Sequence, residues 1–390
     1  MEYSALLLVA TLAAGRPLDD AAQVPDRAAP APAPVTEAAT IAKGWAALAA
    51  GRSTVAAQTA AEVLARVPWN HSALALSIEA LCAGEPLRGL DAYEAWINSQ
   101  PGEDVGLLEP VARGVLQQIA RSEDPELRRN ALRLLSRAGV AAARDALAAS
   151  TQPNDRIDAD AVLAEGGDVA ALKRLEAAAA STDVPDKKPV IQALASVGAA
   201  GVQSLVAMLQ ARSGPERAAI IAALGKMRSE PARPVIKQAM KDPDPFVRAS
   251  AAVALARLRD PEGQSRVQQM LASEVPDIRL MAAEAWDGQD GPWVAAITPL
   301  LENRDGLTRF QAARLIAPVN PELAKRTLQE GLADPNPVIR AESAEIMEQS
   351  VEEYPLVADL GHLRRLLRER DQTVLLHAAG AILAVARRGR

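Results

Sequence analysis

Few side chains in this sequence are of the types that carry out catalysis or bind metals. The 390-residue chain has one cysteine, Cys82, and three histidines, His71, His362 and His377, which lie far apart. A single cysteine excludes an intramolecular disulfide framework and a cysteine-rich zinc site. No two histidines stand at the helical spacing of a zinc-binding pair. We therefore expect no metal site and no histidine-based catalysis.

Motifs for phosphate loops and serine hydrolases are also missing. Neither G-x-x-x-x-G-K-[ST] nor G-x-G-x-x-G nor G-x-S-x-G occurs in the chain. Closely spaced carboxylates such as Asp158 and Asp160 would suit a paired-acid hydrolase, but a charged helix face accounts for them more simply. Cys82 lies in the apolar run IEALCAG and is interpreted as a packing residue. We expect no catalytic residue, no cofactor and no enzymatic activity.

The composition indicates closely packed helices rather than sheets. Hydrophobic residues make up 49% of the chain and aromatic residues only 3%, because 83 residues are alanine. Alanine is the strongest helix former, whereas sheets favour β-branched and aromatic residues. The length allows two or three domains or one long repeat array. The net charge of -6 argues against a general nucleic-acid binder, which needs excess lysine and arginine.

A repeat runs through most of the chain. Four segments, beginning at residues 242, 273, 303 and 334, share a small polar residue followed six positions later by an arginine. Extended in both directions, this arginine position recurs nine times, and six of the eight steps are 30 or 31 residues. Its occupants are Arg128, Arg156, Lys187, Arg217, Arg248, Arg279, Arg309, Arg340 and His377. Apolar residues at helical spacing on both sides predict two helices per unit, joined by a turn with proline.

This pattern resembles the HEAT repeat, in particular the short bacterial form of phycobilisome lyases. The resemblance covers roughly residues 120–390 and implies an all-α, right-handed α-solenoid of stacked antiparallel helix pairs. It also implies a hydrogen-bonded ladder between neighbouring units, formed by the turn residue and the arginine. The residues that match this ladder are Asp242, Arg248, Arg279, Asn303, Arg309, Asp334 and Arg340.

The first 120 residues differ in character from the array. Residues 1–15 contain an apolar run that fits a signal peptide but lacks a basic start, and 16–40 form a linker rich in proline and alanine. We expect export, with a cytoplasmic protein carrying a disordered tail as the alternative. Residues 41–120 resemble tetratricopeptide helices and are predicted to cap the array, which occupies 121–390 in about nine units. No segment is long enough to span a membrane.

Charge is distributed unevenly along the chain. Residues 1–120 hold seven basic and thirteen acidic side chains, so the whole net charge of -6 belongs to them. The last thirty residues carry a net charge of +5. This basic tip would suit an acidic surface, although solubility of the terminal helix and its macrodipole explain it as well.

The function that remains is recognition of a protein or peptide. In the family that the repeats resemble, the second helix of each unit lines the concave side, which assigns a set of residues to that surface. They are Arg129, Arg133, Arg257, Glu284, Phe310, Arg314 and Glu345. Trp293 ends the irregular segment DGQDGPW (287–293), which is interpreted as a binding loop, with the filling of a gap in the core as the alternative role of this tryptophan. Arginine and aromatic residues are favoured as interface anchors. We expect a non-enzymatic scaffold that binds its partner there. The alternative is a lyase or a chaperone-like accessory to a chromophore or cofactor enzyme.

Overall fold

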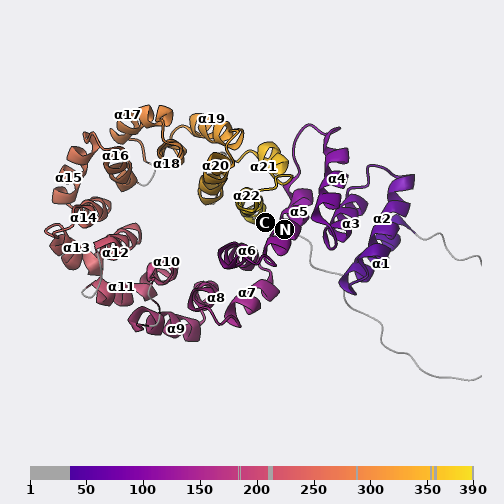
Figure 1. Cartoon of the computed structure of the whole chain (residues 1–390), viewed down its shortest axis with the longest axis horizontal. Helices are drawn as coiled ribbons and strands as arrows, with labels where there is room; N and C mark the ends of the chain where they lie inside the picture. Colours follow the sequence, from indigo (N-terminus) through magenta and orange to yellow (C-terminus); the bar gives the residue numbers. More distant parts are fainter. Residues whose placement is uncertain are drawn as a thin grey trace, which may run out of the picture.

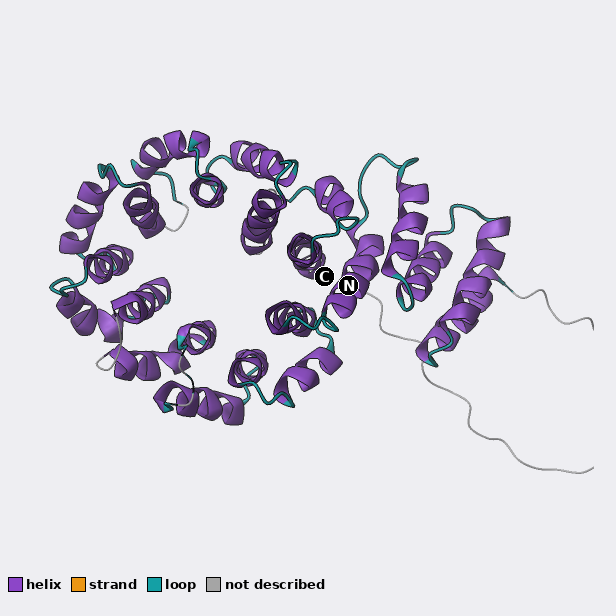
Figure 2. Ribbon diagram, viewed as in Figure 1, coloured by secondary structure: helices purple, strands orange, loops and turns teal. Residues whose placement is uncertain are grey.

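Every regular element in the described part of the chain is helical. The computed structural model describes residues 36–182, 184, 186–209, 214–286, 289–351, 354 and 358–388. Within these ranges there are 22 α-helices and no strand. Figure 2 shows the helices and the loops that join them. The predicted all-α class is therefore confirmed. The apolar segment 1–15 and almost all of the 16–40 linker lie outside the described residues.

Five helices precede the first inner helix of the repeat array, and each packs on the helix before it. They are α1 (Glu37–Ala49), α2 (Ser53–Arg66), α3 (His71–Cys82), α4 (Pro86–Ile97) and α5 (Val105–Ile119). The side chains of Thr36, Asn70 and Asp104 accept the orphan N–H groups at the starts of α1, α3 and α5. Helix α5 also packs on α6 and so completes the first helix pair of the array.

The remaining helices form two concentric layers (Figure 1). The inner helices are α6 (Pro125–Arg137), α8 (Pro153–Glu165), α10 (Lys188–Ser196), α12 (Gly214–Lys226), α14 (Pro245–Arg257), α16 (Pro276–Ala283), α18 (Gly306–Ile316), α20 (Pro337–Val351) and α22 (Gln372–Arg388). The outer helices are α7 (Ala141–Ala148), α9 (Val169–Ala180), α11 (Val202–Met208), α13 (Arg233–Ala239), α15 (Pro261–Leu271), α17 (Trp293–Ile297), α19 (Pro321–Leu332) and α21 (Leu360–Leu366). Short 3₁₀ helices, η1 (Gly198–Gly201), η3 (Glu230–Ala232), η4 (Glu284–Trp286) and η5 (Thr298–Glu302), border them.

The two ends of the array meet, so the solenoid is a closed ring. The last inner helix, α22, packs on α5 and α6 as well as on α20. A single apolar core runs through this junction and includes Val111 and Leu116 of α5 together with Ala379 and Ile382 of α22. The array therefore has no free end at its last unit, unlike an open superhelix, whose terminal faces must be shielded by a cap.

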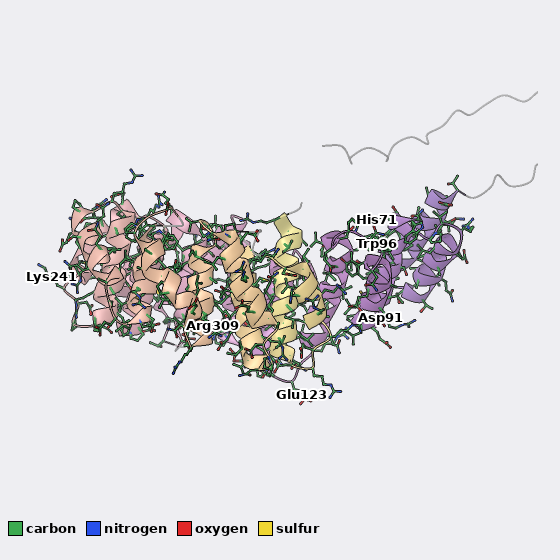
Figure 3. The ribbon with its side chains drawn as sticks, turned by 90° about the horizontal axis from the view of Figure 1, so that it is seen from above. His71, Asp91, Trp96, Glu123, Lys241 and Arg309 are labelled. Atoms are coloured by element: carbon green, nitrogen blue, oxygen red, sulfur yellow. The ribbon has the colours of Figure 1, made fainter. Side chains whose placement is uncertain are left out.

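Ion pairs reinforce this junction at its outer edge. Arg364 of α21 donates to Glu94 of α4 at 2.9 Å and to Glu103 at 3.1 Å. Arg368 donates to Asp91 at 2.6 Å and also to Glu94. The acidic surface that the basic tip meets thus belongs to the same chain. Figure 3 shows the ring edge-on, with the N-terminal helices and Asp91 projecting beyond it.

The recurring arginine holds the turn within its own unit. Its guanidinium Nη1 donates to the backbone carbonyl of the residue six positions earlier. The donor–acceptor distances are 2.8 Å for Arg128, 3.5 Å for Arg156, 2.7 Å for Arg248, 3.0 Å for Arg279, 2.6 Å for Arg309 and 2.7 Å for Arg340. The buried Lys187 makes the same contact through Nζ. Because a carbonyl is available whatever the side chain, the type of residue at that turn position can vary.

Among the described residues, two ladder positions form side-chain links between neighbouring units. The carboxylate of Asp242 accepts two hydrogen bonds from Arg217 of the preceding unit, at 2.8 and 2.9 Å. Arg340 reaches forward to Glu369 at 3.1 Å. Elsewhere the polar turn residue mainly accepts the N–H two positions later, as Asn303 does at 2.9 Å. The predicted ladder residues therefore act mainly inside each unit.

Candidate functional site

A pocket lies on the inner wall where the two ends of the array meet. Its volume is about 660 Å³, and side chains of five neighbouring inner helices line it. We call it the closure pocket. Its principal residues are Arg129, Arg133, Asp158, Lys188, Glu345 and His377, from α6, α8, α10, α20 and α22. Three predicted binding residues, Arg129, Arg133 and Glu345, are thus brought together from opposite ends of the array.

Both signs of charge are present in the closure pocket. Nε of Arg129 lies 3.9 Å from Oδ2 of Asp158 and, within the described residues, has no hydrogen-bond partner. Burial raises the pKa of Asp158, although the guanidinium groups of Arg133 and Arg129 act in the opposite direction. On the facing helices, Nδ1 of His377 lies 3.1 Å from Oε2 of Glu348. The closure pocket therefore presents both hydrogen-bond donors and hydrogen-bond acceptors.

Three other predicted residues form an ion cluster on the inner helices. Nε of Arg257 donates to the carbonyl of Glu284 at 3.0 Å, and its Nη2 lies 3.8 Å from the Glu284 carboxylate. Nη2 of Arg314 donates to the same carboxylate at 3.3 Å. Glu284 therefore joins α14 to α18, and the structure gives these three residues a role in linking units.

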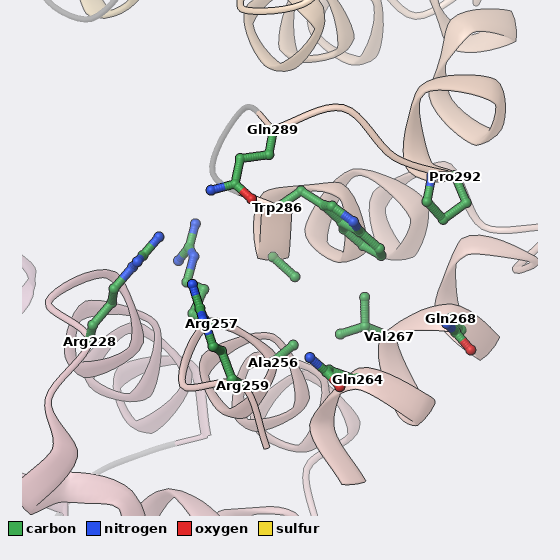
Figure 4. Close-up of a pocket in the computed structure, with 11 residues that line it drawn as sticks. Arg228, Ala256, Arg257, Arg259, Gln264, Val267, Gln268, Trp286, Gln289 and Pro292 are labelled. Carbon is green, nitrogen blue, oxygen red and sulfur yellow. The ribbon is translucent and has the colours of Figure 1, made fainter. Parts of the chain in front are cut away.

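A second pocket opens beside Arg257, at the rim where the inner helices end (Figure 4). We call it the rim pocket. Its volume is about 580 Å³, and its polar lining consists mainly of arginine and glutamine. The side chains that define it are Arg228, Arg257, Arg259, Gln264, Gln268 and Trp286. None of its described lining residues carries a carboxylate.

Two of these arginines occupy backbone positions that favour glycine. Arg228 and Arg259 have φ angles of +49° and +57°. The equivalent position after the inner helices of the three preceding units is glycine, with φ from +66° to +90° at Gly139, Gly167 and Gly198. Neither arginine was among the residues expected at a site from the sequence. The signal was present, because the five positions follow one another at steps of 28 to 31 residues.

Two predicted surface anchors are instead buried, and their assignment to the binding surface is corrected. Phe310 is 1% exposed, and its ring packs against Gly331 of α19, where an added Cβ would lie 2.5 Å from Cζ. Trp293 is also 1% exposed, and its Nε1 donates to the carbonyl of Gln289 at 2.7 Å. Gly331 on the facing helix leaves room for the Phe310 ring. The residue pattern of α18 alone does not reveal this space.

Cys82 and His71, two residues whose types could carry out chemistry, are engaged in contacts within the fold. Burial raises the pKa of the Cys82 thiol to about 12, so the thiol is unreactive at neutral pH. His71 contacts the Asp104 carboxylate at 2.8 Å. Among the residues that the structure describes, no group of three or more histidine, cysteine, aspartate or glutamate side chains is arranged to hold a metal ion. No helix in the same ranges is both long and apolar enough to cross a bilayer.

Comparison with known proteins identifies the repeats in the middle of the array. Residues 202–286 match the family model of HEAT repeats. A search of curated proteins gave no match. Among solved structures, human deoxyhypusine hydroxylase in complex with glycerol is similar with a TM-score of 0.32 and 18% identity, covering 72% of this chain and 98% of that chain. The family match agrees with the observed helix pairs, and the structural similarity carries no argument about activity.

Proposed function

We propose that this chain, whose residues 202–286 are HEAT repeats, is a non-enzymatic scaffold that binds an extended segment of a protein partner on its inner wall. The observation that carries the proposal is the closure pocket. Five inner helices contribute polar side chains to one concavity, and its volume of about 660 Å³ lies in the range of ordinary ligand pockets. Such a volume holds a few residues of an extended chain.

The chemistry of the wall supports a peptide as the ligand. Arg133 and Lys188 make no side-chain ion pair with any described residue, so their donors are available to a ligand. The carboxylate of Glu345 accepts one hydrogen bond, from Gln349 at 3.1 Å, and retains further acceptor capacity. A peptide presents N–H and carbonyl groups to both kinds of side chain. Charged groups at the pocket would then select the sequence.

Ring closure restricts how a partner can bind. Because α22 packs on α5 and α6, the array cannot wrap around a folded domain from an open end without breaking that junction. A segment without tertiary structure can instead enter from a rim and order itself on the wall. Such coupled ordering lowers the affinity per unit area of interface, so we expect a moderate affinity and a rapid exchange.

Site-specific photo-cross-linking in the native host tests this proposal. A cross-linking residue is placed at Gln192, which is exposed in the closure pocket, or at Arg326, which is exposed on the outer helix α19. We expect a protein cross-linked from position 192 and not from 326. The triple variant Arg129→Gln, Arg133→Gln, Glu345→Gln should reduce the yield at 192 at least tenfold. Equal yields from the two positions, or a yield that the triple variant does not alter, would contradict the proposal.

A further inference from the structure

Four exposed apolar side chains follow one another along the rim where the inner helices begin. They come from the first turns of four successive inner helices, α14, α16, α18 and α20 (Figure 1). The exposed fractions are 54% for Phe246, 52% for Val275, 48% for Leu307 and 59% for Val338. We call these four residues the apolar strip. Each of the four helices packs on the next one, and packed helices lie about 8–10 Å apart, so the side chains form one row.

The helix caps show that Val275 is unfavourable in a single chain. Asp244 caps α14 and Asp305 caps α18, each by accepting a backbone N–H group. The corresponding position of α16 is occupied by Val275, whose side chain accepts no hydrogen bond. Loss of a capping side chain costs about 1 kcal/mol, and the valine is exposed to water as well. A contact that covers the strip would offset this cost.

The size of the strip suits a second copy of the same chain. With each side chain about half exposed, the strip leaves roughly 400 Å² of apolar surface in water. A contact between two such strips would cover about 800 Å², and a little over half of a typical interface is apolar. The complete interface would therefore bury about 1,400 Å², which lies within the range of stable, specific interfaces.

Charges beside the strip are complementary about a two-fold axis through its middle. Such an axis, passing between α16 and α18, places the first turn of α16 opposite the first turn of α18 in the other copy. Glu274 and Arg304, which precede these two helices, are exposed, and their side chains make no hydrogen bond or ion pair with a described residue. Asp305 is turned towards its own helix, where it accepts the N–H of Thr308 at 2.7 Å. Each Glu274 can therefore meet an Arg304 across the interface, and the axis repeats this pair.

We propose that the chain forms a two-fold symmetric dimer in which the apolar strips of two copies pack against each other. Phe246 then lies opposite Val338, and Val275 lies opposite Leu307, so that the two rings meet rim to rim. A contact in which both copies use the same surface closes on itself, so association stops at the dimer. The strip shares no residue with the closure pocket, and the proposal does not depend on the function proposed for that pocket.

Sedimentation velocity of the full chain measures this association. We expect the wild type to pass from monomer to dimer between about 1 and about 100 µM. Leu307→Asp places a carboxylate in the first turn of α18, where the helix macrodipole favours it, so the fold is preserved. Because the change acts twice in each dimer, it should weaken association at least tenfold. The matched control is Val169→Asp at the start of the outer helix α9, where the valine is 65% exposed, and it should leave association unchanged.

A charge exchange tests the two-fold register itself. Arg304→Glu alone should weaken association, because it sets two carboxylates against each other at two places. The double variant Arg304→Glu, Glu274→Arg restores the pair with its charges reversed and should associate within about threefold of the wild type.

Three results would overturn the proposal. They are a wild type that stays monomeric at the highest concentration, a Leu307→Asp variant that associates as tightly as the wild type, and a double variant that associates no better than Arg304→Glu. If a monomeric wild type co-sediments with phosphatidylcholine vesicles and Leu307→Asp does not, the strip is a membrane contact instead.

Discussion

The chain has only two phenylalanines, and their surroundings differ completely. Phe246 stands near the start of α14 and is 54% exposed, whereas Phe310 in α18 is 1% exposed and covered by α19. The Arg309 guanidinium carbon also lies 5.5 Å from the centre of the Phe310 ring. An aromatic residue next to the recurring arginine was expected on the binding surface. Its actual role is to fill the space that Gly331 leaves between two helices.

Replacement of the two phenylalanines by alanine should therefore have very different effects. Phe310→Ala removes a fully buried ring and should lower the free energy of unfolding by about 3–5 kcal/mol. Phe246→Ala removes an exposed ring and should change it by less than about 0.5 kcal/mol. Urea denaturation followed by circular dichroism measures both. Similar stabilities of the two variants would mean that the Phe310 ring is not buried in solution.

At the scale of the helix pair, one turn is held by contacts from two units. Asp242, in the turn before α14, accepts hydrogen bonds from both units. Nη1 of Arg248 donates to its backbone carbonyl, and Arg217 of α12 donates to its carboxylate. The Arg217 hydrogen bonds hold the pKa of the Asp242 carboxyl below its ordinary value of 3.8. This is the arrangement that the HEAT resemblance implies, and it lies within the segment that matches the family.

The depressed pKa of Asp242 predicts how stability depends on pH. A carboxyl group with a lowered pKa in the folded state contributes stability above its unfolded pKa and loses it as the pH falls through the folded value. Asp242→Asn should therefore lower the midpoint of thermal unfolding by a few degrees at pH 7. The difference from the wild-type chain should shrink as the pH falls below 3.8.

The matched control for this titration is Asp277→Asn. Asp277 is exposed at the start of α16 and makes no ion pair with a described residue. Its replacement should change the midpoint of thermal unfolding at pH 7 much less than Asp242→Asn does. Differential scanning calorimetry measures the midpoint of thermal unfolding of the wild type and both variants. The measurements run from about pH 2.5 to about pH 7, which includes the range over which carboxylates titrate. A constant difference between wild type and Asp242→Asn across that range would contradict the assigned role of the ion pair.

At the scale of the whole molecule, the main feature is the closed ring. Linear repeat proteins unfold from their ends, because a terminal unit has a neighbour on one side only. Here α22 has α20 on one side and α5 and α6 on the other. Gly380 allows this close approach, since an added Cβ would lie 2.7 Å from the Glu348 carboxylate and 3.0 Å from Cδ1 of Leu134 in α6.

Gly380→Leu should open the ring. A leucine side chain cannot fit between α20 and α6 without displacing one of them, and overpacking of this kind costs about 1–3 kcal/mol or more. We expect a larger radius of gyration by small-angle X-ray scattering and faster hydrogen exchange in α5, α6 and α22. Exchange in α14 should be unaffected. Gly84→Leu between α3 and α4, where the nearest atom lies 3.8 Å from an added Cβ, is the control. Unchanged scattering from Gly380→Leu would argue against closure through α22.

The sequence by itself determined the repeating unit, because the features that define it are local. Helical periodicity, the turn and the arginine six residues after it all lie within one unit of about 31 residues, and they predicted the helix pairs. The resemblance to HEAT repeats also assigned Arg129, Arg133 and Glu345 to the concave surface. Whether the units form an open superhelix or a ring depends on a small rotation between each unit and the next. The total of these rotations decides closure, and no pattern within one unit encodes that total. Only the tertiary structure decided that α22 returns to α5, that Phe310 faces the core, and that Arg228 and Arg259 share a pocket.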